Sequence, residues 1–288
     1  MKKYQKLLNQ AMLAPLVNEI IGQYDTRLTV RQIYYRLVAK NIIPNIRSRY
    51  NSFDSLLTRL REDGLVDPNR IVDRSRGTIG GESAVEESPE EFLTGELEAF
   101  KDCWQQYDLP LWASQSSSIE IWLEKDALSN LVGQICGRYR VLLFPCRGYS
   151  SFQMLWEAGG RLKSDTSILY LGDHDPSGLD MEDYIAENCH SNIERIALTR
   201  EQIDQYKLPA QPVKLRDSRS PRYIAEHGRE CWEIDALPPD ALQRIIDKAI
   251  REYIDQGAWD KRLEEIEEGQ EEAKIVLKRI MDDLDTEG

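Results

Sequence analysis

Three acidic side chains follow strand-like runs in the second half of the chain, and together they could hold a metal ion. Glu124 comes directly after the apolar run 119–123, and Asp173 and Asp175 follow the run 167–171. The carboxyl ends of parallel strands meet at one edge of an open α/β sheet, and residues two apart on a strand share a face. We therefore expect Glu124, Asp173 and Asp175 to converge. Their hard oxygen ligands suit Mg²⁺, which can polarise a phosphodiester or activate water.

The same acidic segment has a purely structural alternative. In 173–178, the pattern Asp-x-Asp-Pro-x-Gly can simply cap a helix and turn the chain. Glu124 at the matching strand end favours metal binding over this alternative. His174 lies between the two acids, and without a second soft ligand it is more typical of a structural or substrate-side contact than of a metal ligand.

A second candidate group lies on a predicted helix near the N-terminus. Tyr34 belongs to the apolar stripe of this helix, whereas Tyr35 lies about 100° around from it, on the side of Arg31 and Arg27. A phenol with its usual pKa of about 10 needs a cation or a base before it can attack phosphorus, and Arg31 could be that cation. The alternative is an aromatic side chain that only packs against a DNA backbone.

The elements around this tyrosine predict a small DNA-binding domain. Apolar spacing predicts a helix over about 4–24, a second helix over 30–40 with Thr29 as its N-cap, and a third that starts after an N-cap at Ser52 and ends at Gly64. Short β-like pieces follow over 65–76. Three short helices followed by a basic ribbon are typical of a winged helix-turn-helix.

The charge distribution agrees with DNA as a partner, although the formal net charge is −13. Between Arg27 and Gly77 there are eleven Lys or Arg against five Asp or Glu, whereas the acidic excess lies in 82–103 and after Trp232. The acidic tail could be a solvated helix or a protein-binding surface. Basic side chains that could contact DNA are Arg27, Arg36, Arg59, Arg61, Arg74, Arg76 and Arg147.

The remaining pattern predicts an α/β domain that positions the acids. Strand-like runs at 119–123, 141–144, 167–171 and 193–198 alternate with helical runs at 126–137, 150–163, 178–189 and 200–205. This alternation predicts a parallel sheet with crossover helices. We therefore divide the chain into a DNA-binding domain (1–80), an acidic linker and helix (81–111), a metal-binding α/β domain (112–240) and a charged helical tail (241–288).

Composition excludes several other classes of protein. No apolar run approaches the roughly eighteen residues that a membrane span needs, and the first residues lack a signal-peptide core. The five cysteines are widely spaced without a Cys-x-x-Cys pair, so we expect reduced, mostly buried thiols rather than disulfides or a zinc site. A cytoplasmic, nucleoid-associated protein is the expectation.

In their order along the chain, these motifs resemble those of the topoisomerase VI A subunit and the related meiotic double-strand-break transesterase. The matching segments are Arg31-Gln32-Ile33-Tyr34-Tyr35, Glu124-Lys125-Asp126-Ala127, Arg147-Gly148-Tyr149-Ser150, Asp173-His174-Asp175-Pro176-Ser177-Gly178 and Trp232-Glu233-Ile234-Asp235-Ala236-Leu237. The resemblance implies an N-terminal winged-helix domain followed by a Toprim domain that binds Mg²⁺. It also implies a homodimer in which the tyrosine of one protomer acts with the Toprim site of the other.

Three functions follow from these motifs. The first is Mg²⁺-dependent DNA cleavage by a transesterase, in which Tyr35 attacks a backbone phosphate held by Arg31, and Glu124, Asp173 and Asp175 bind the metal. The second is a Toprim nuclease that hydrolyses DNA with metal-activated water. The third is a non-catalytic winged-helix DNA-binding protein. Because the sequence contains no P-loop, any ATP-driven step would need a separate ATPase or regulatory subunit.

Overall fold

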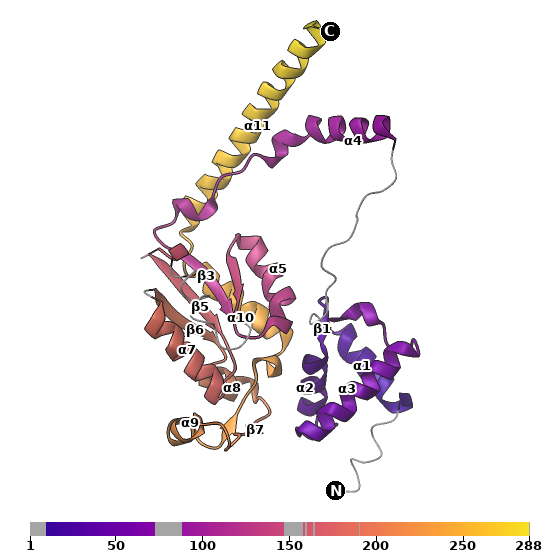
Figure 1. Ribbon diagram of the computed structural model, residues 1–288, viewed down its shortest axis with the longest axis vertical. Coiled ribbons are helices and arrows are strands. Elements are labelled where there is room, and N and C mark those ends of the chain that lie inside the picture. The colour runs from indigo at the N-terminus through magenta and orange to yellow at the C-terminus, as the bar shows by residue number, and fades with distance from the viewer. Residues whose placement is uncertain are drawn as a thin grey trace. The chain divides into compact units, whose positions relative to one another are not determined.

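The computed structural model describes residues 10–72, 88–146, 158, 160–163, 165–189 and 191–287. The chain divides into two units (Figure 1). The first unit combines Met1–Arg76 with Ile119–Glu252, and the second combines Gly77–Ser118 with Tyr253–Gly288. The first unit therefore contains both the tyrosine helix and the acids singled out in the sequence.

Three helices form the N-terminal part of the first unit: α1 (Gln10–Gly22), α2 (Val30–Ala39) and α3 (Arg47–Glu62). The predicted start of α2 is confirmed. The Thr29 hydroxyl accepts a hydrogen bond from the Gln32 N–H at 3.1 Å, and the Gln32 side chain accepts one from the Thr29 N–H at 2.8 Å. This reciprocal capping box satisfies two N–H groups that a helix start otherwise leaves without partners.

The predicted N-cap of the third helix is wrong. Helix α3 already begins at Arg47, after the extended residue Ile46, so that Ser52 lies inside it. The Ser52 hydroxyl donates to the Ser48 carbonyl at 2.9 Å. A serine inside a helix can satisfy its hydroxyl on the carbonyl four residues earlier, and sequence alone does not separate this role from capping.

A short strand pair joins the segment before α2 to the segment after α3. Strand β1 (Leu28–Thr29) pairs in parallel with β2 (Ile71–Val72), which follows the 3₁₀ turn η1 (Pro68–Arg70). The rest of the predicted basic ribbon and most of the linker fall on 73–87, outside the described residues. The winged-helix arrangement therefore stays a prediction.

A four-stranded parallel sheet forms the second part of the first unit, as the alternating pattern predicts. Its strands are β3 (Ser118–Leu123), β4 (Leu142–Pro145), β5 (Thr166–Leu171) and β6 (Asn192–Ala197), in the order β4-β3-β5-β6. The turn η4 (Asp126–Leu128) and helix α5 (Ser129–Tyr139) connect β3 to β4. Of the helix predicted over 150–163, only 158 and 160–163 lie among the described residues.

Helices cover both faces of this sheet (Figure 1). Trp122 and Tyr170 lie in a core cluster with Met181 and Ile185 of helix α7 (Pro176–Asn188). Neighbouring strand residues point to the opposite face, where α5 packs against α10 (Pro239–Arg251) and α10 contacts β6. The alternating buried residues thus make the two-sided core that a parallel sheet requires.

The chain returns from the sheet to α2 through a series of short elements. After β6 come α8 (Arg200–Tyr206), β7 (Gln211–Pro212), α9 (Ser220–His227), β8 (Glu230–Cys231) and the 3₁₀ turn η5 (Ile234–Ala236). Strands β7 and β8 pair antiparallel, and His174 forms a β-bridge with Trp232. Helix α2 packs against η5. The segment 230–236 therefore contacts both the end of β5 and the tyrosine helix.

The second unit consists of α4 (Pro89–Lys101), the 3₁₀ turns η2 (Cys103–Gln106) and η3 (Leu111–Ser114), and the long helix α11 (Gln256–Glu287). The Trp112 and Trp259 rings meet edge to face at 5.7 Å. At Gly269, an added Cβ would lie 2.2 Å from the Tyr107 ring, so the absence of a side chain allows this ring to approach the helix. The segment predicted as a helical tail, 241–288, is mostly helical, and its first helix, α10 (Pro239–Arg251), belongs to the first unit.

Cys136, Cys146 and Cys189 are buried, as expected for most of the thiols, and Cys103 and Cys231 are partly exposed. Within the described part of the chain, no helix is long and apolar enough to cross a membrane.

Candidate active site

The sheet brings two of the three predicted acids into direct contact. Glu124 follows β3, and Asp173 lies two residues beyond β5. The Glu124 N–H donates to the Leu171 carbonyl at 2.9 Å, and the Asp173 N–H donates to the Glu124 carboxylate at 2.9 Å. The Asp173 carboxylate in turn accepts a hydrogen bond from the Ile234 N–H at 2.8 Å. Glu124 and Asp173 therefore meet at the carboxyl edge of the sheet.

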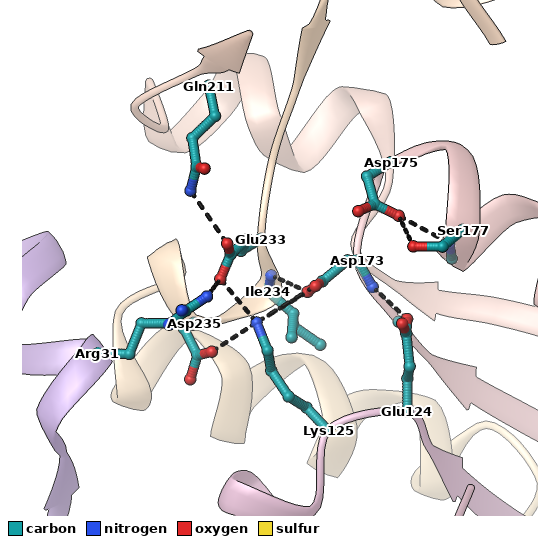
Figure 2. A network of polar contacts seen from close by, with 12 residues as sticks. Arg31, Glu124, Lys125, Asp173, Asp175, Ser177, Gln211, Glu233, Ile234 and Asp235 are labelled. Carbon is teal, nitrogen blue, oxygen red and sulfur yellow. Dashed lines mark hydrogen bonds and ion pairs between the residues drawn. The ribbon is translucent and has the colours of Figure 1, made fainter. Parts of the chain in front are cut away.

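Asp175 makes the contacts of a helix cap. Its carboxylate accepts hydrogen bonds from the Gly178 N–H at 2.7 Å and from the Ser177 hydroxyl at 2.8 Å, at the start of α7 (Figure 2). The capping alternative considered for this segment is thus realised at Asp175. Its two oxygens still leave acceptor capacity, since one carboxylate offers about four lone-pair directions.

Proximity and burial change the acidity of the pair. Burial and the charge of Asp173 raise the pKa of Glu124 to about 7. Burial also raises the pKa of Asp173 to about 6, against the opposing charge of Lys125. Adjacent buried carboxylates that repel one another are stabilised by a bound cation.

Lys125 places an ammonium group among the acids. Its Nζ lies 2.7 Å from Asp235, 2.9 Å from Glu233 and 3.2 Å from Asp173. Although burial opposes a charge here, Asp173, Asp235 and Glu233 hold the pKa of Lys125 well above its usual range. Among the described residues, no three acidic, His or Cys side chains are arranged as a ready-made metal site. In this conformation the Lys125 ammonium group contacts the Asp173 carboxylate.

Glu233 links the acidic edge to the tyrosine helix (Figure 2). Its carboxylate pairs with Arg31 of α2 as well as with Lys125, and it accepts a hydrogen bond from the Gln211 amide at 3.1 Å. Burial favours the neutral acid, but the charges of Lys125 and Arg31 lower the pKa of Glu233 to about 2. Glu233 is therefore a permanent anion between two cations.

Tyr35 lies in this network and is buried. Its side chain is 2% exposed, and its hydroxyl accepts a hydrogen bond from the Gln211 amide. Burial and the charge of Glu233 raise the pKa of Tyr35 above its usual value, against the opposing charges of Lys125 and Arg31. The phenol is thus protonated in this conformation, while two cations that could lower its pKa lie within electrostatic range.

A cavity of about 530 Å³ opens beside the tyrosine helix. Arg31 and Tyr35 line it from α2, and Arg47 lines it from α3. Lys214 and Glu233 line it from the residues 200–236 between β6 and α10, which we call the return segment. The Arg31 guanidinium also stacks over the Tyr50 ring, 4.9 Å from the ring centroid. Three cations and an aromatic surface around one cavity suit a phosphate-bearing ligand.

The other predicted DNA-binding residues lie in different surroundings. Arg27 and Arg59 are exposed. Arg61 donates to the Thr58 hydroxyl on its own helix, and Arg36 donates to the Ala236 carbonyl, so Arg36 contributes to packing between α2 and η5. Arg74, Arg76 and Arg147 lie outside the described residues.

Two residues support the loop that carries the acids. Arg195 of β6 donates to the carbonyls of Gly172 at 3.0 Å, Asp173 at 3.2 Å and Gly178 at 3.1 Å. At Gly178 an added Cβ would lie 2.2 Å from the Asp173 carbonyl oxygen, so only glycine fits. The last residue of the Asp-x-Asp-Pro-x-Gly motif therefore allows α7 to start directly against the acidic loop.

Four residues of the site are not among the catalytic, metal-binding or DNA-binding residues expected from the sequence: Lys125, Gln211, Glu233 and Asp235. Lys125 lies in the motif Glu124-Lys125-Asp126-Ala127, and Glu233 and Asp235 lie in the motif that begins at Trp232, so these motifs carry the signal that could have found them. Gln211 belongs to a two-residue strand and lies in no motif. Its part in the site follows only from the pairing of β7 with β8.

The fold and the site together define an α/β protein with a carboxylate edge on a parallel sheet and an ion-paired tyrosine helix packed beside it. No protein-family model matches the chain, and no curated protein is significantly similar to it.

Proposed function

We propose that this protein is a Mg²⁺-dependent DNA-cleaving transesterase of the topoisomerase VI A type, with Tyr35 as the nucleophile. The single observation that carries the proposal is the Glu233 carboxylate, which pairs at once with Arg31 of the tyrosine helix and with Lys125 at the acidic edge. The predicted nucleophile and the predicted metal ligands, distant in sequence, thus belong to one polar network. The basic N-terminal segment and the order of the motifs add to this support.

The acidic edge fits Mg²⁺ by its chemistry. Glu124, Asp173 and Asp175 would hold the ion. Asp235, which pairs with Lys125, has a buried Oδ1 atom without a hydrogen-bond partner. The ion would supply positive charge for a phosphate oxygen or for the departing 3′ oxygen. Burial is the main cause of the raised pKa values of Glu124 and Asp173, and repulsion from nearby carboxylates adds to it. A bound cation would offset both effects.

The chain's own residues would position the phosphate and the nucleophile. A DNA phosphate would take the place of Glu233 on Arg31, and Arg47 and Lys214 would contact neighbouring phosphates from the cavity walls. Glu233 would then no longer raise the pKa of Tyr35, and Lys125 and Arg31 would favour the phenolate against burial and the charge of the phosphate. The Tyr35 oxygen then bonds to phosphorus, the bond from phosphorus to the 3′ oxygen breaks, and the 3′ oxygen gains the proton that the phenol loses.

One observation favours a second function. Tyr35 is almost fully buried, and its hydroxyl already has a partner in Gln211. A phenol held in this way would suit a nuclease in which water is the nucleophile and Tyr35 only lines the phosphate cavity. This alternative uses the same acids and the same metal.

A denaturing gel separates these functions. Purified protein is incubated with end-labelled duplex or supercoiled DNA, with and without Mg²⁺, and the wild type is compared with Tyr35→Phe and Asp173→Asn. Tyr34→Phe is the matched control, because Tyr34 lies on the same helix and its hydroxyl donates to the Pro44 carbonyl outside the charge network.

Each function has its own result. The transesterase predicts protein-linked 5′ ends that disappear in Tyr35→Phe and in Asp173→Asn and persist in Tyr34→Phe. Free 5′ phosphates that disappear only in Asp173→Asn would identify the hydrolytic nuclease. Salt-sensitive DNA binding without cleavage by the wild type would identify a non-catalytic DNA-binding protein and overturn the proposal.

A further inference from the structure

Gln211 connects the tyrosine to the charge network through a single amide group. Its Nε2 atom donates one hydrogen bond to the Tyr35 hydroxyl oxygen and a second one to the Glu233 carboxylate, at 3.1 Å. Figure 2 shows the contact with Glu233. The side-chain amide of glutamine carries two hydrogens on this nitrogen. Both hydrogens of the Gln211 amide are therefore used, one on each partner.

Glu233 determines which end of the Gln211 amide faces Tyr35. The nitrogen and oxygen ends of a side-chain amide are distinguished by their hydrogen-bond partners. An ionised carboxylate can only accept hydrogen bonds. Although burial favours the neutral acid, the charges of Lys125 and Arg31 lower the pKa of Glu233 to about 2, so it stays ionised. The nitrogen end must therefore point towards Glu233, and the same nitrogen reaches the Tyr35 oxygen.

The backbone around Gln211 is held on both sides. Before it, the Asn45 side chain, in the loop between α2 and α3, donates to the Ala210 carbonyl at 2.8 Å. After it, the Val213 N–H donates to the Arg229 carbonyl at 3.0 Å, beside the pairing of β7 with β8. The Gln211 amide thus reaches the tyrosine helix from a backbone with defined contacts.

The bond from Gln211 leaves the hydrogen of the Tyr35 hydroxyl for another acceptor. A phenolic oxygen can accept one hydrogen bond while it donates another. Because the Gln211 nitrogen is the donor, the Tyr35 hydrogen takes no part in this bond. Tyr35 also lines the cavity of about 530 Å³ beside α2. The hydrogen that a nucleophilic phenol must lose is therefore available for transfer.

We propose that Gln211 is a further catalytic residue, whose amide holds the Tyr35 oxygen and stabilises the negative charge that develops on it during attack. The inference rests on the proposed function, in which Tyr35 is the nucleophile. The bond from Tyr35 to phosphorus forms, the bond from phosphorus to the 3′ oxygen breaks, and the phenolic hydrogen ends on the 3′ oxygen. Gln211 keeps both of its own hydrogens. A phosphate that replaces Glu233 also accepts hydrogen bonds, so the amide keeps its orientation when DNA binds.

The developing charge makes this hydrogen bond stronger during the reaction. A hydrogen bond to an ionised oxygen is roughly twice as strong as one to a neutral oxygen. Burial and the charges of Glu233 and Asp235 raise the pKa of Tyr35, whereas the two cations of the network lower it. The Gln211 amide adds a donor aimed at the oxygen itself, and it favours the transition state over the resting phenol.

The first test measures adduct formation and DNA affinity separately. Gln211→Met keeps the length of the side chain and removes both donors, and Gln211→Glu keeps its shape but presents acceptors only. Gln23→Met makes the same change as the first variant at an exposed residue outside the site. The rate at which protein-linked 5′ ends form is measured in a single turnover with saturating duplex DNA and Mg²⁺. The Kd for the same DNA is measured without Mg²⁺.

Both Gln211 variants should form the protein-linked 5′ end roughly 10- to 100-fold more slowly than the wild type, as expected for one lost hydrogen bond to a charged group. The Kd of Gln211→Met and both quantities for Gln23→Met should match the wild type. Equal rates for Gln211→Met and the wild type, or a loss confined to DNA affinity, would overturn this inference and leave the proposed function standing. A wild type that forms no protein-linked 5′ end would overturn both.

A second measurement tests the hydrogen bond without cleavage. The side-chain amide protons of Gln211 are assigned by NMR as the pair that is lost in Gln211→Met and in Gln211→Glu. In Tyr35→Phe, one of these resonances should move upfield because its acceptor is gone, while the other stays bonded to Glu233. Tyr34→Phe should leave both unchanged, since the Tyr34 hydroxyl donates to the Pro44 carbonyl. Two unchanged resonances in Tyr35→Phe would overturn the inference even if the protein cleaves DNA.

Discussion

Lys125 offers the sharpest test of the charge network. We predict that Lys125→Met lowers the free energy of unfolding at pH 7, because Asp173, Glu233 and Asp235 lose the ammonium group that contacts all three. Removing one partner of a buried ion pair costs about 3–5 kcal/mol. The Lys125 side chain is 22% exposed, and Glu233 keeps its pair with Arg31. We therefore expect the lower end of that range, about 3 kcal/mol.

Urea denaturation at pH 7 and pH 5, with and without Mg²⁺, measures this effect. The loss should shrink at pH 5, where the uncompensated carboxyls can take up protons, and Mg²⁺ should stabilise the variant more than the wild type. Lys248→Met is the control, since Lys248 is 80% exposed and pairs with Glu252 only at 3.7 Å. Its effect should stay within about 0.5 kcal/mol. A loss below about 1 kcal/mol for Lys125→Met, insensitive to pH and Mg²⁺, would refute the role assigned to this lysine.

Three further predictions concern the same region. Gly178→Ala should destabilise the protein by about 1–3 kcal/mol and abolish cleavage, because its Cβ would meet the Asp173 carbonyl oxygen; thermal denaturation and the cleavage gel measure both effects. Burial lowers the pKa of His174 to about 4, so the unfolded chain binds more protons at pH 5 than the folded chain does. The free energy of unfolding of the wild type should therefore fall from pH 7 to pH 5 by about 2 kcal/mol more than that of His174→Gln. An equal fall for both proteins, measured by denaturant titration at the two pH values, would contradict this. The resemblance implies that the tyrosine acts with the acids of the other protomer, whereas Glu233 joins Arg31 and Lys125 within one chain. From that contact we predict that an equal mixture of Tyr35→Phe and Asp173→Asn stays inactive; recovered cleavage would instead show that the tyrosine acts with the partner's acids.

Local sequence patterns predict much of the fold. The strands at 118–123, 142–145, 166–171 and 192–197 follow the predicted runs closely, because strands buried on both faces leave apolar runs between turn residues. The start of α2 is equally clear from the capping residues Thr29 and Gln32. Helix α3 is less predictable, since Ser52 suits a cap and a helix interior almost equally well.

Local sequence patterns predict only part of the candidate site. Glu124 and Asp173 are predictable because each follows a strand, and the alternation of strand-like and helical runs predicts where these strands end. The network around Glu233 depends on how the return segment packs against α2, and charge patterns carry no information about that packing. The burial of Tyr35 has the same origin. Its helical position suggests a side chain at the margin of the core, whereas contact with the return segment covers it.

The ion pair between Arg31 and Glu233 has a consequence for how salt affects this protein. A phosphate that binds Arg31 competes with a carboxylate of the same molecule, so the apparent affinity is reduced by the fraction of molecules in which this pair is closed. Salt weakens phosphate binding by counterion release, but it also screens the internal pair and increases the open fraction. DNA binding should therefore depend less steeply on salt in the wild type than in Glu233→Gln. The difference between the two salt dependences of the affinity measures how strongly Glu233 competes with a phosphate for Arg31.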